Sequence, residues 1–268
     1  YYLQYHSRLP YFGGVVLDPF QVTPTALLPV PGLPSYYIEY PEDIRLWGLS
    51  LSTTSDSGVT ISGEYTLREN QPIQWNGSEI AHGGLLRLHS RHLLQRAEEA
   101  GVTPLELAGI ELKGYDRFKV SQLQLSTIKF IDKLWGADQM TFIAELGSVY
   151  IHGLPDQDEA RYGRDGIFGN GDFDGLASPV VPDLNPFLPV TYSCTGEGAS
   201  NAVNSNPSYC DSEGYTTAIS WGYVLAMFFD YQSVFTGVNL KPELVLTHDV
   251  KGHSPSPMGL FVEGRKSV

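Results

Sequence analysis

The stretch YTTAISWGYVLAMFFDY, Tyr215 to Tyr231, decides the fold class. Aromatic and aliphatic side chains occupy most of its odd positions, and most even positions are small or polar. Successive side chains of a strand point to opposite faces, so this period of two predicts a long β-strand with one apolar face. The run exceeds the typical strand of about 5 to 6 residues.

A partner strand follows after the short connection Gln232 to Gly237 and alternates in the same way as far as Asp249. Two hairpins of this kind occur upstream, one turning at Ser55 to Gly58 and one at Trp135 to Asp138. Tyr1 to His6 reads as the end of a further strand. The sequence therefore predicts antiparallel hairpins throughout.

The connections between these hairpins are long, whereas the turns within them are tight. We expect the long loops over 7–42, 69–115 and 152–214, all at one end of the strands. Outer-membrane barrels combine short periplasmic turns with long extracellular loops, whereas compact soluble domains rarely carry several loops of this length. The pattern favours an all-β, antiparallel transmembrane β-barrel wall. A short helix is predicted over Leu85 to Ala100, ending at Gly101, as a lid or plug.

Composition narrows the choice of partners. The chain has 268 residues with 17 Lys plus Arg and 30 Asp plus Glu, a net charge of −13, which argues against nucleic acid as a partner. No apolar run approaches about 18 residues, so a membrane-spanning helix is not expected. A soluble β-sandwich also alternates apolar and polar positions. Aromatics near the strand ends, at Trp47, Tyr65, Tyr215 and Tyr231, favour the barrel.

The alternation assigns a direction to each strand residue. Residues expected to face lipid are Trp221, Tyr223, Leu225, Phe229, Leu240 and Leu244. Residues expected to line the lumen are Glu64, Arg68, Gln122, Gln124, Glu145, Asn239, Lys241 and Glu243. Such a polar lining either conducts solutes or pairs its charges across a filled barrel, and the sequence leaves both open.

Two further groups of residues carry candidate chemistry. Cys194 and Cys210 are expected to form one disulfide in an oxidising compartment, with two buried thiols as the alternative. Asp165, Asn170, Asp172 and Asp174 lie among glycines and form a candidate calcium site, without the spacing of an EF-hand. No other cofactor is expected.

The histidines and the motifs of nucleophilic enzymes provide less evidence for a functional site than these two groups do. His82, His89 and His92 would share a face of the predicted helix, although no carboxylate or cysteine completes a metal-ligand set. The chain contains no Gly-x-Ser-x-Gly elbow, phosphate loop or dinucleotide fingerprint. We therefore expect no enzyme activity.

Specific segments resemble a family of Gram-negative outer-membrane proteins catalogued as domain of unknown function thirteen-oh-two. The segments that carry the resemblance are YHSRLP (5–10), YPEDIRLWGLS (40–50), GYDR (114–117), VSQLQ (120–124), RYGRD (161–165), WGY (221–223), GVNLKP (237–242), HDVKG (248–252) and EGRK (263–266). They follow the family's order. Members look like barrels of about twice this length, so the chain resembles a central to C-terminal portion, a single barrel domain over 1–268 with strands missing at both ends.

The resemblance implies a location and a role. It points to the outer membrane and to passage of hydrophobic small molecules, alongside a periplasmic component and an inner-membrane permease. Two other classes stay open on the residues alone. One is a structural or adhesive barrel that presents its loops, and the other is a soluble secreted β-domain.

Overall fold

The computed structural model describes residues 1–18, 35–164, 166–169, 171, 175–177, 190–193, 201–202, 208, 210–255, 257 and 259–268. Its largest element is a nine-stranded antiparallel sheet in the order β1-β4-β5-β7-β8-β12-β14-β15, with β13 also paired to β12. The strands are β1 (Tyr2–Tyr5), β4 (Ile44–Thr54), β5 (Val59–Gln74), β7 (Tyr115–Asp132), β8 (Gln139–His152), β12 (Ile219–Phe235), β13 (Val238–Leu240), β14 (Glu243–Lys251) and β15 (Lys266–Ser267). The predicted all-β antiparallel architecture is confirmed.

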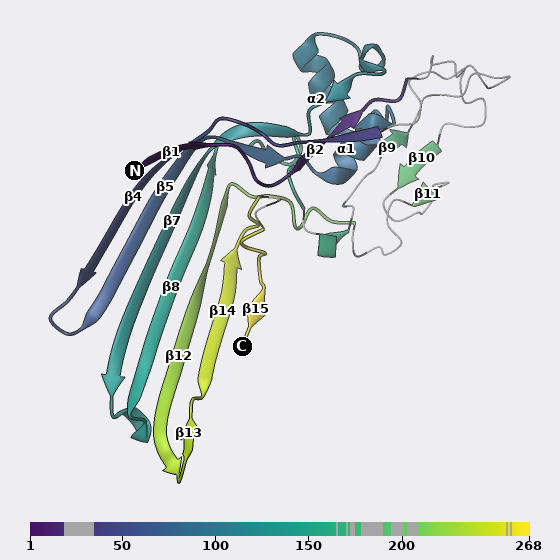
Figure 1. Ribbon diagram of the computed structural model, residues 1–268. Coiled ribbons are helices and arrows are strands. Elements are labelled where there is room, and N and C mark those ends of the chain that lie inside the picture. Colours follow the sequence, from purple (N-terminus) through teal and green to yellow (C-terminus); the bar gives the residue numbers. More distant parts are fainter. Residues whose placement is uncertain are drawn as a thin grey trace.

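The sheet is a tall curved wall whose strands run side by side from one end to the other (Figure 1). Three tight hairpin turns lie at one end, and the long connections with the helices lie at the opposite end (Figure 1). We call these the turn end and the loop end. Over the described residues the sheet is open, with β1 and β15 as its edges.

The long connections carry short elements of their own, and most of these were not predicted. Two small sheets have the orders β3-β2-β6 and β11-β10-β9, and among the described strands only the β10–β11 pair is parallel. Their strands are β2 (Tyr11–Val15), β3 (Ser35–Glu39), β6 (Glu111–Leu112), β9 (Gly175–Ala177), β10 (Val190–Ser193) and β11 (Asn201–Ala202). The helices of these connections are α1 (Gly77–Gly84), α2 (Arg91–Ala100) and the 3₁₀ turns Pro104–Leu107 and Gly166–Phe168, whereas a third 3₁₀ turn, Leu134–Gly136, lies in the tight turn between β7 and β8.

The helix predicted over 85–100 is corrected by the structure. Its end at Gly101 is confirmed, because Gly101 adopts the left-handed conformation (φ 67°) that glycine tolerates at a helix C-terminus. Its start is wrong. α2 begins at Arg91, where Ser90 caps it by accepting from the Leu93 amide at 3.2 Å, and a separate helix that was not predicted, α1, is capped by Asn76 and ends at Gly84, before the predicted start.

The longest predicted strand is also shifted. β12 begins at Ile219, and Tyr215 forms only an isolated bridge to Gly163. Tyr215 is fully buried at the loop end, so its predicted place in an interfacial aromatic row is wrong. The alternation of apolar and polar residues therefore extends upstream of Ile219, into a segment that lies outside the large sheet.

The buried apolar core lies at the loop end. One cluster joins Ile73 and Val120 of the sheet to Ile80 of α1 and to Tyr162 in the following loop, and a second cluster surrounds Leu93 of α2. Among the described residues no helix is long and apolar enough to cross a bilayer. Among the described residues, neither cluster includes a side chain from β13, β14 or the hairpin turns at the turn end.

Candidate functional site

The registers of the large sheet give it two chemically different faces. Partners across an antiparallel ladder point to the same side, so each row of paired residues belongs to one face. One row reads Leu51, Gly63, Leu125, Leu146 and Tyr223, and the neighbouring row reads Ser52, Ser62, Ser126, Glu145 and Val224. We call the first side the apolar face and the second the polar face.

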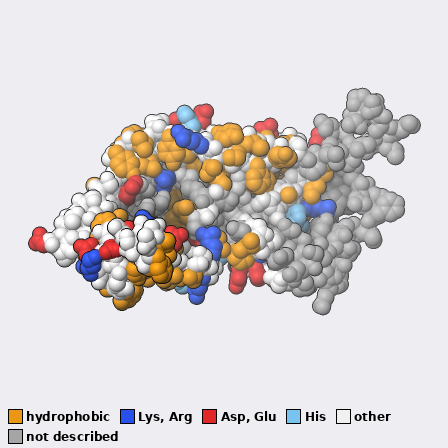
Figure 2. Space-filling view, turned by 60° about the horizontal axis from the view of Figure 1, so that its bottom comes forward, with side chains coloured by type: hydrophobic (Ala, Val, Ile, Leu, Met, Phe, Trp, Pro, Cys, Tyr) orange, Lys and Arg blue, Asp and Glu red, His pale blue; other side chains and the backbone are white. Residues whose placement is uncertain are grey.

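The apolar face is exposed. Leu49 is 69% exposed, Leu51 60% and Leu125 42%, and no buried cluster includes them. A soluble sandwich would bury this face against a second sheet, and the described residues supply none. Broad hydrophobic patches with scattered charges are visible on the surface in Figure 2.

All six residues expected to face lipid belong to this face by register. Trp221, Tyr223, Leu225 and Phe229 are half-buried along β12. Leu240 pairs with Tyr231 and is 47% exposed, and Leu244 pairs with Met227 and is 45% exposed. None of the six enters a packed core.

Aromatic side chains mark both ends of the apolar face. At the loop end the Trp47 ring lies 4.6 Å from that of Tyr2, and the hydroxyl of Tyr65 lies 2.9 Å from that of Ser121. At the turn end Trp135 stacks on Phe229 with ring centroids 5.7 Å apart. Between these two rows the face is mainly aliphatic.

Most residues predicted to line a lumen lie on the polar face. Glu64 and Gln124 are paired across β5 and β7, and Gln122 and Glu145 follow on the same side. Arg68 donates to Gln122 Oε1 at 3.2 Å and to the Tyr5 hydroxyl at 3.2 Å, while the Tyr1 hydroxyl donates to Glu64. β1 is thus fastened to the wall by side-chain hydrogen bonds.

The other three predicted lumen residues lie toward the turn end. Lys241 Nζ lies 3.7 Å from Asp230, and Asn239 accepts from the Ser233 amide at 2.8 Å, which closes the hairpin turn. Glu243 pairs with Phe228 in the ladder, so it also lies on the polar face, and it is exposed. Asn239 therefore has a turn-forming contact that the alternation alone did not indicate.

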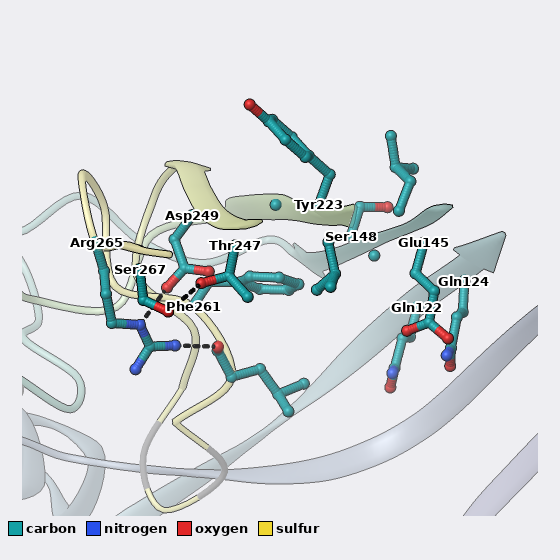
Figure 3. A pocket seen from close by; sticks show the side chains of 15 residues that line it. Gln122, Gln124, Glu145, Ser148, Tyr223, Thr247, Asp249, Phe261, Arg265 and Ser267 are labelled. Carbon is teal, nitrogen blue, oxygen red and sulfur yellow. Dashed lines mark hydrogen bonds and ion pairs between the residues drawn. The ribbon is translucent and has the colours of Figure 1, made fainter. Parts of the chain in front are cut away.

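A cavity of about 420 Å³ lies on the polar face beneath the C-terminal segment. Gln122, Gln124 and Glu145 point toward the same side in Figure 3, whereas Tyr223 points away. The residues that line the cavity are Gln122, Gln124, Glu145, Leu146, Gly147, Ser148, Gly222, Tyr223, Val224, Thr247, Asp249, Leu260, Phe261, Arg265 and Ser267.

The described part of the C-terminal segment, residues 252–255, 257 and 259–268, is held over this cavity by Asp249. Asp249 Oδ2 accepts from the Val262 amide at 3.0 Å and from Arg265 Nε at 2.6 Å, and Arg265 also donates to the Leu260 carbonyl at 2.8 Å (Figure 3). Glu263 accepts from the Gly252 amide at 2.7 Å. These contacts fix the segment as a strap across the wall.

Gly147 lets the strap lie close to the sheet. A Cβ atom on Gly147 would lie 3.1 Å from Phe261 Cζ, which is tighter than ordinary contact. Phe261 also packs against the loop-end core. Sequence reasoning missed Asp249, Leu260, Phe261 and Arg265 because nothing in the pattern of a terminal polar segment shows that it folds back. The facing pair Gly147 and Gly222 was the only available signal.

A capping layer covers the loop end of the polar face. Asp116 of β7 accepts from Trp75 Nε1, from the Tyr162 hydroxyl at 2.7 Å and from Arg96 of α2 at 2.8 Å. Burial and the Asp116 carboxylate raise the pKa of Tyr162. Burial raises the pKa of Glu79, while Arg91, 3.3 Å away, opposes the shift.

The three histidines do not share one face, so that prediction is wrong. His82 and His89 contact each other at 2.8 Å, whereas His92 bonds the Lys113 carbonyl at 2.7 Å beside Trp75. The reason is the break between α1 and α2. Within the described residues no group of three or more His, Cys, Asp or Glu side chains is arranged to hold a metal ion.

The candidate calcium residues Asp165, Asn170, Asp172 and Asp174 lie outside the described residues. Cys194 also lies outside them, so its disulfide with Cys210 stays a prediction.

Together the geometry defines an open antiparallel wall with one exposed apolar face, one polar face and a cap at the loop end. The chain belongs to the family described as Protein of unknown function (DUF1302), whose model matches residues 1–268. This confirms the family that the sequence motifs indicate. Comparison with curated proteins and with solved structures finds no significant match.

Proposed function

We propose that this chain forms part of the wall of an outer-membrane β-barrel in a Gram-negative cell, and that its polar face lines a passage for small molecules. One observation carries the proposal: strands of up to 18 residues expose an apolar face on one side and a polar face on the other. An aliphatic surface of this size is unfavourable in water and favourable against lipid tails.

The spacing of the aromatic rows supports the membrane part of the proposal. Trp221 near the loop end and Tyr231 near the turn end lie ten positions apart on β12. Ten residues of strand span about 33 Å, and a tilt of about 40° reduces this to a height of about 25 Å, the apolar band of such barrels. The turn end would then lie on the periplasmic side and the loop end outside.

A wall in lipid requires every backbone hydrogen-bonding group to be paired. The proposal therefore requires β1 and β15, the edges of the described sheet, to be paired in the membrane. The cap over the loop end would act as a plug or lid, since it covers Val120 and Ile151 on the polar face.

Hydrophobic small molecules are the substrate class that the family resemblance implies. It also implies a periplasmic component and an inner-membrane permease as partners. The Leu260 and Phe261 side chains at the cavity support an apolar substrate, because they give a largely polar surface an apolar contact.

Entry of N-phenylnaphthylamine, a hydrophobic dye that an intact outer membrane excludes, tests the passage. Cells with the whole protein should take up or expel the dye at a rate different from cells without it. Gly147→Trp should restore the rate of the deletion strain, because the side chain would displace Phe261 and fill the cavity. Leu125→Phe, on the other face, is the matched control and should behave as the unsubstituted protein.

Two outcomes would favour the other classes of protein. Equal dye rates with and without the protein in the outer membrane would support a barrel that only presents its loops. Recovery of the whole protein from cells in soluble form without detergent would support a secreted β-domain.

A further inference from the structure

The cavity beneath the strap has an unbalanced negative charge. Two carboxylates of the polar face are paired with cations, Asp249 with Arg265 and Asp230 with Lys241, and Glu64 accepts a hydrogen bond from the neutral Tyr1 hydroxyl. Glu145 is exposed at the cavity, and within the part of the chain that the structure describes it has no hydrogen bond or ion pair. An unmatched carboxylate favours a cation as its partner.

Neutral amides lie beside this carboxylate. Gln124 pairs with Gly147 across the ladder, two rows from Glu145 and on the same face, and Gln122 lies two rows further. The Gln122 carbonyl accepts from Arg68, which also donates to the Tyr5 hydroxyl and does not line the cavity. The amides therefore add hydrogen-bonding capacity without adding charge.

The strap supplies the apolar side of the same cavity. Leu260 is 44% exposed, and Phe261 lies against Gly147. Val224, the ladder partner of Glu145, adds a third apolar side chain from the sheet. A ligand in this position would touch apolar atoms on the strap side and a carboxylate on the β8 side.

The volume fits one small molecule. Ligand pockets commonly enclose about 300 to 1,000 Å³ and combine apolar walls with a few polar groups that fix orientation. The cavity encloses about 420 Å³ with both kinds of lining. Its size excludes a macromolecule and suits a compact amphiphile.

We propose that this cavity is a binding site for an amphipathic small molecule with a cationic, nitrogen-centred head, which Glu145 and the two glutamines receive while Leu260, Phe261 and Val224 contact its apolar body. This inference rests on the proposed function, because it treats the polar face as a lumen. It narrows the substrate class from hydrophobic molecules in general to amines with an apolar part.

Octylamine, octanol and octanoate, which share one alkyl chain and differ in head charge, test the proposal. Binding is measured by calorimetry on the whole protein in phospholipid nanodiscs, with the signal of protein-free nanodiscs subtracted. Octylamine should bind at least tenfold more tightly than octanol, and octanoate should bind most weakly. Equal affinities for the three, or the tightest binding by octanoate, would overturn the proposal.

Substitutions in the cavity lining test whether octylamine binds at this site. Glu145→Gln keeps the volume and removes the charge, so it should weaken octylamine about tenfold and leave octanol unchanged. Phe261→Ala should weaken both. Glu243→Gln is the matched control, because Glu243 is another exposed carboxylate of the polar face that is outside the cavity lining. An equal loss of octylamine binding in Glu243→Gln and Glu145→Gln would contradict the site.

A second measurement on the same nanodiscs separates this inference from the proposed function. A bimane label at Leu125 should be quenched by spin-labelled lipid if the apolar face contacts lipid. Quenching with no preference for octylamine removes only the ligand site, whereas absence of quenching removes the membrane wall on which it depends.

Discussion

Trp135 stacks on Phe229 at the turn end of the sheet, with ring centroids 5.7 Å apart and planes 26° from parallel. Trp135 lies in the turn between β7 and β8, and its side chain is 73% exposed. An indole that is this exposed contributes little to the stability of a protein in water. At a membrane interface its ring can bury apolar atoms while its N–H stays in contact with water.

Replacing Trp135 therefore distinguishes a position in water from a position at a membrane interface. Trp135→Ala should lower the free energy of unfolding by about 1 kcal/mol, the scale of an aromatic pair, when urea unfolding is followed in phospholipid vesicles. Trp135→Phe should recover most of the loss because it can still stack on Phe229. An alanine variant as stable as the unsubstituted protein would argue against an interfacial position.

Adjacent residues on β7 should respond oppositely to an added charge. Leu125→Arg should cost about 2 to 4 kcal/mol of stability in lipid, the range for arginine at the bilayer midplane. Ser126→Arg is the control, because Ser126 pairs with Glu145 on the polar face, and it should cost less than about 1 kcal/mol. Similar losses in both variants would mean that the two faces meet the same environment.

The strap should depend on Asp249. Asp249→Asn weakens the charge-assisted hydrogen bond from Arg265 and the hydrogen bond from the Val262 amide. This substitution should lower the free energy of unfolding by about 1 to 3 kcal/mol. Amide hydrogen exchange over residues 254–265 should become faster, whereas exchange in β5 and β7 should not change. Unchanged protection at Val262 would show that other contacts hold the strap.

Acid should loosen the cap through His92. Burial lowers the pKa of His92 from its ordinary value to about 4; Arg96 also lowers it, while Asp116, Glu99 and the bond to Lys113 oppose the shift. The neutral ring is favoured in the folded state. This contribution to stability is fully present above pH about 6.5 and is lost as the pH falls toward about 4.

Fluorescence can follow that change, because the rings of His92 and Trp75 lie 5.1 Å apart. Trp75 emission in the whole protein, with Trp47, Trp135 and Trp221 of this chain replaced by Phe, should shift to longer wavelength between pH 6.5 and 4. In a His92→Gln background the shift should become smaller, since glutamine does not titrate. The same shift in both proteins would assign the transition to other groups.

The sequence predicted the hairpins because a period of two, sustained over about 10 residues, matches the geometry of a strand and not that of a helix. The alternation assigns the adjacent residues Gln124 and Leu125 to opposite faces, and the strand register confirms this assignment. The small sheet around β2 and the break between α1 and α2 were not predictable, because short elements depend on contacts distant in sequence. One example is Gln74, which donates to the Phe12 carbonyl at 2.9 Å.

The cavity escaped prediction for a related reason. Glu145, Gln122 and Gln124 were assigned to the polar face by alternation, but the strap that turns this face into a cavity comes from residues with no periodicity. Asp249 reads as one more polar strand residue in the sequence. Only the folded chain shows that it accepts hydrogen bonds from Val262 and Arg265.

The orientation of consecutive residues toward lipid tests the central claim most directly. Single cysteines at positions 122 to 126 of β7 are labelled in turn with bimane in the whole protein, reconstituted in vesicles that contain spin-labelled lipid. Strong quenching should occur at Leu123 and Leu125 and weak quenching at Gln122, Gln124 and Ser126. Uniform quenching, or none at Leu123 and Leu125, would contradict a wall between lipid and a polar passage.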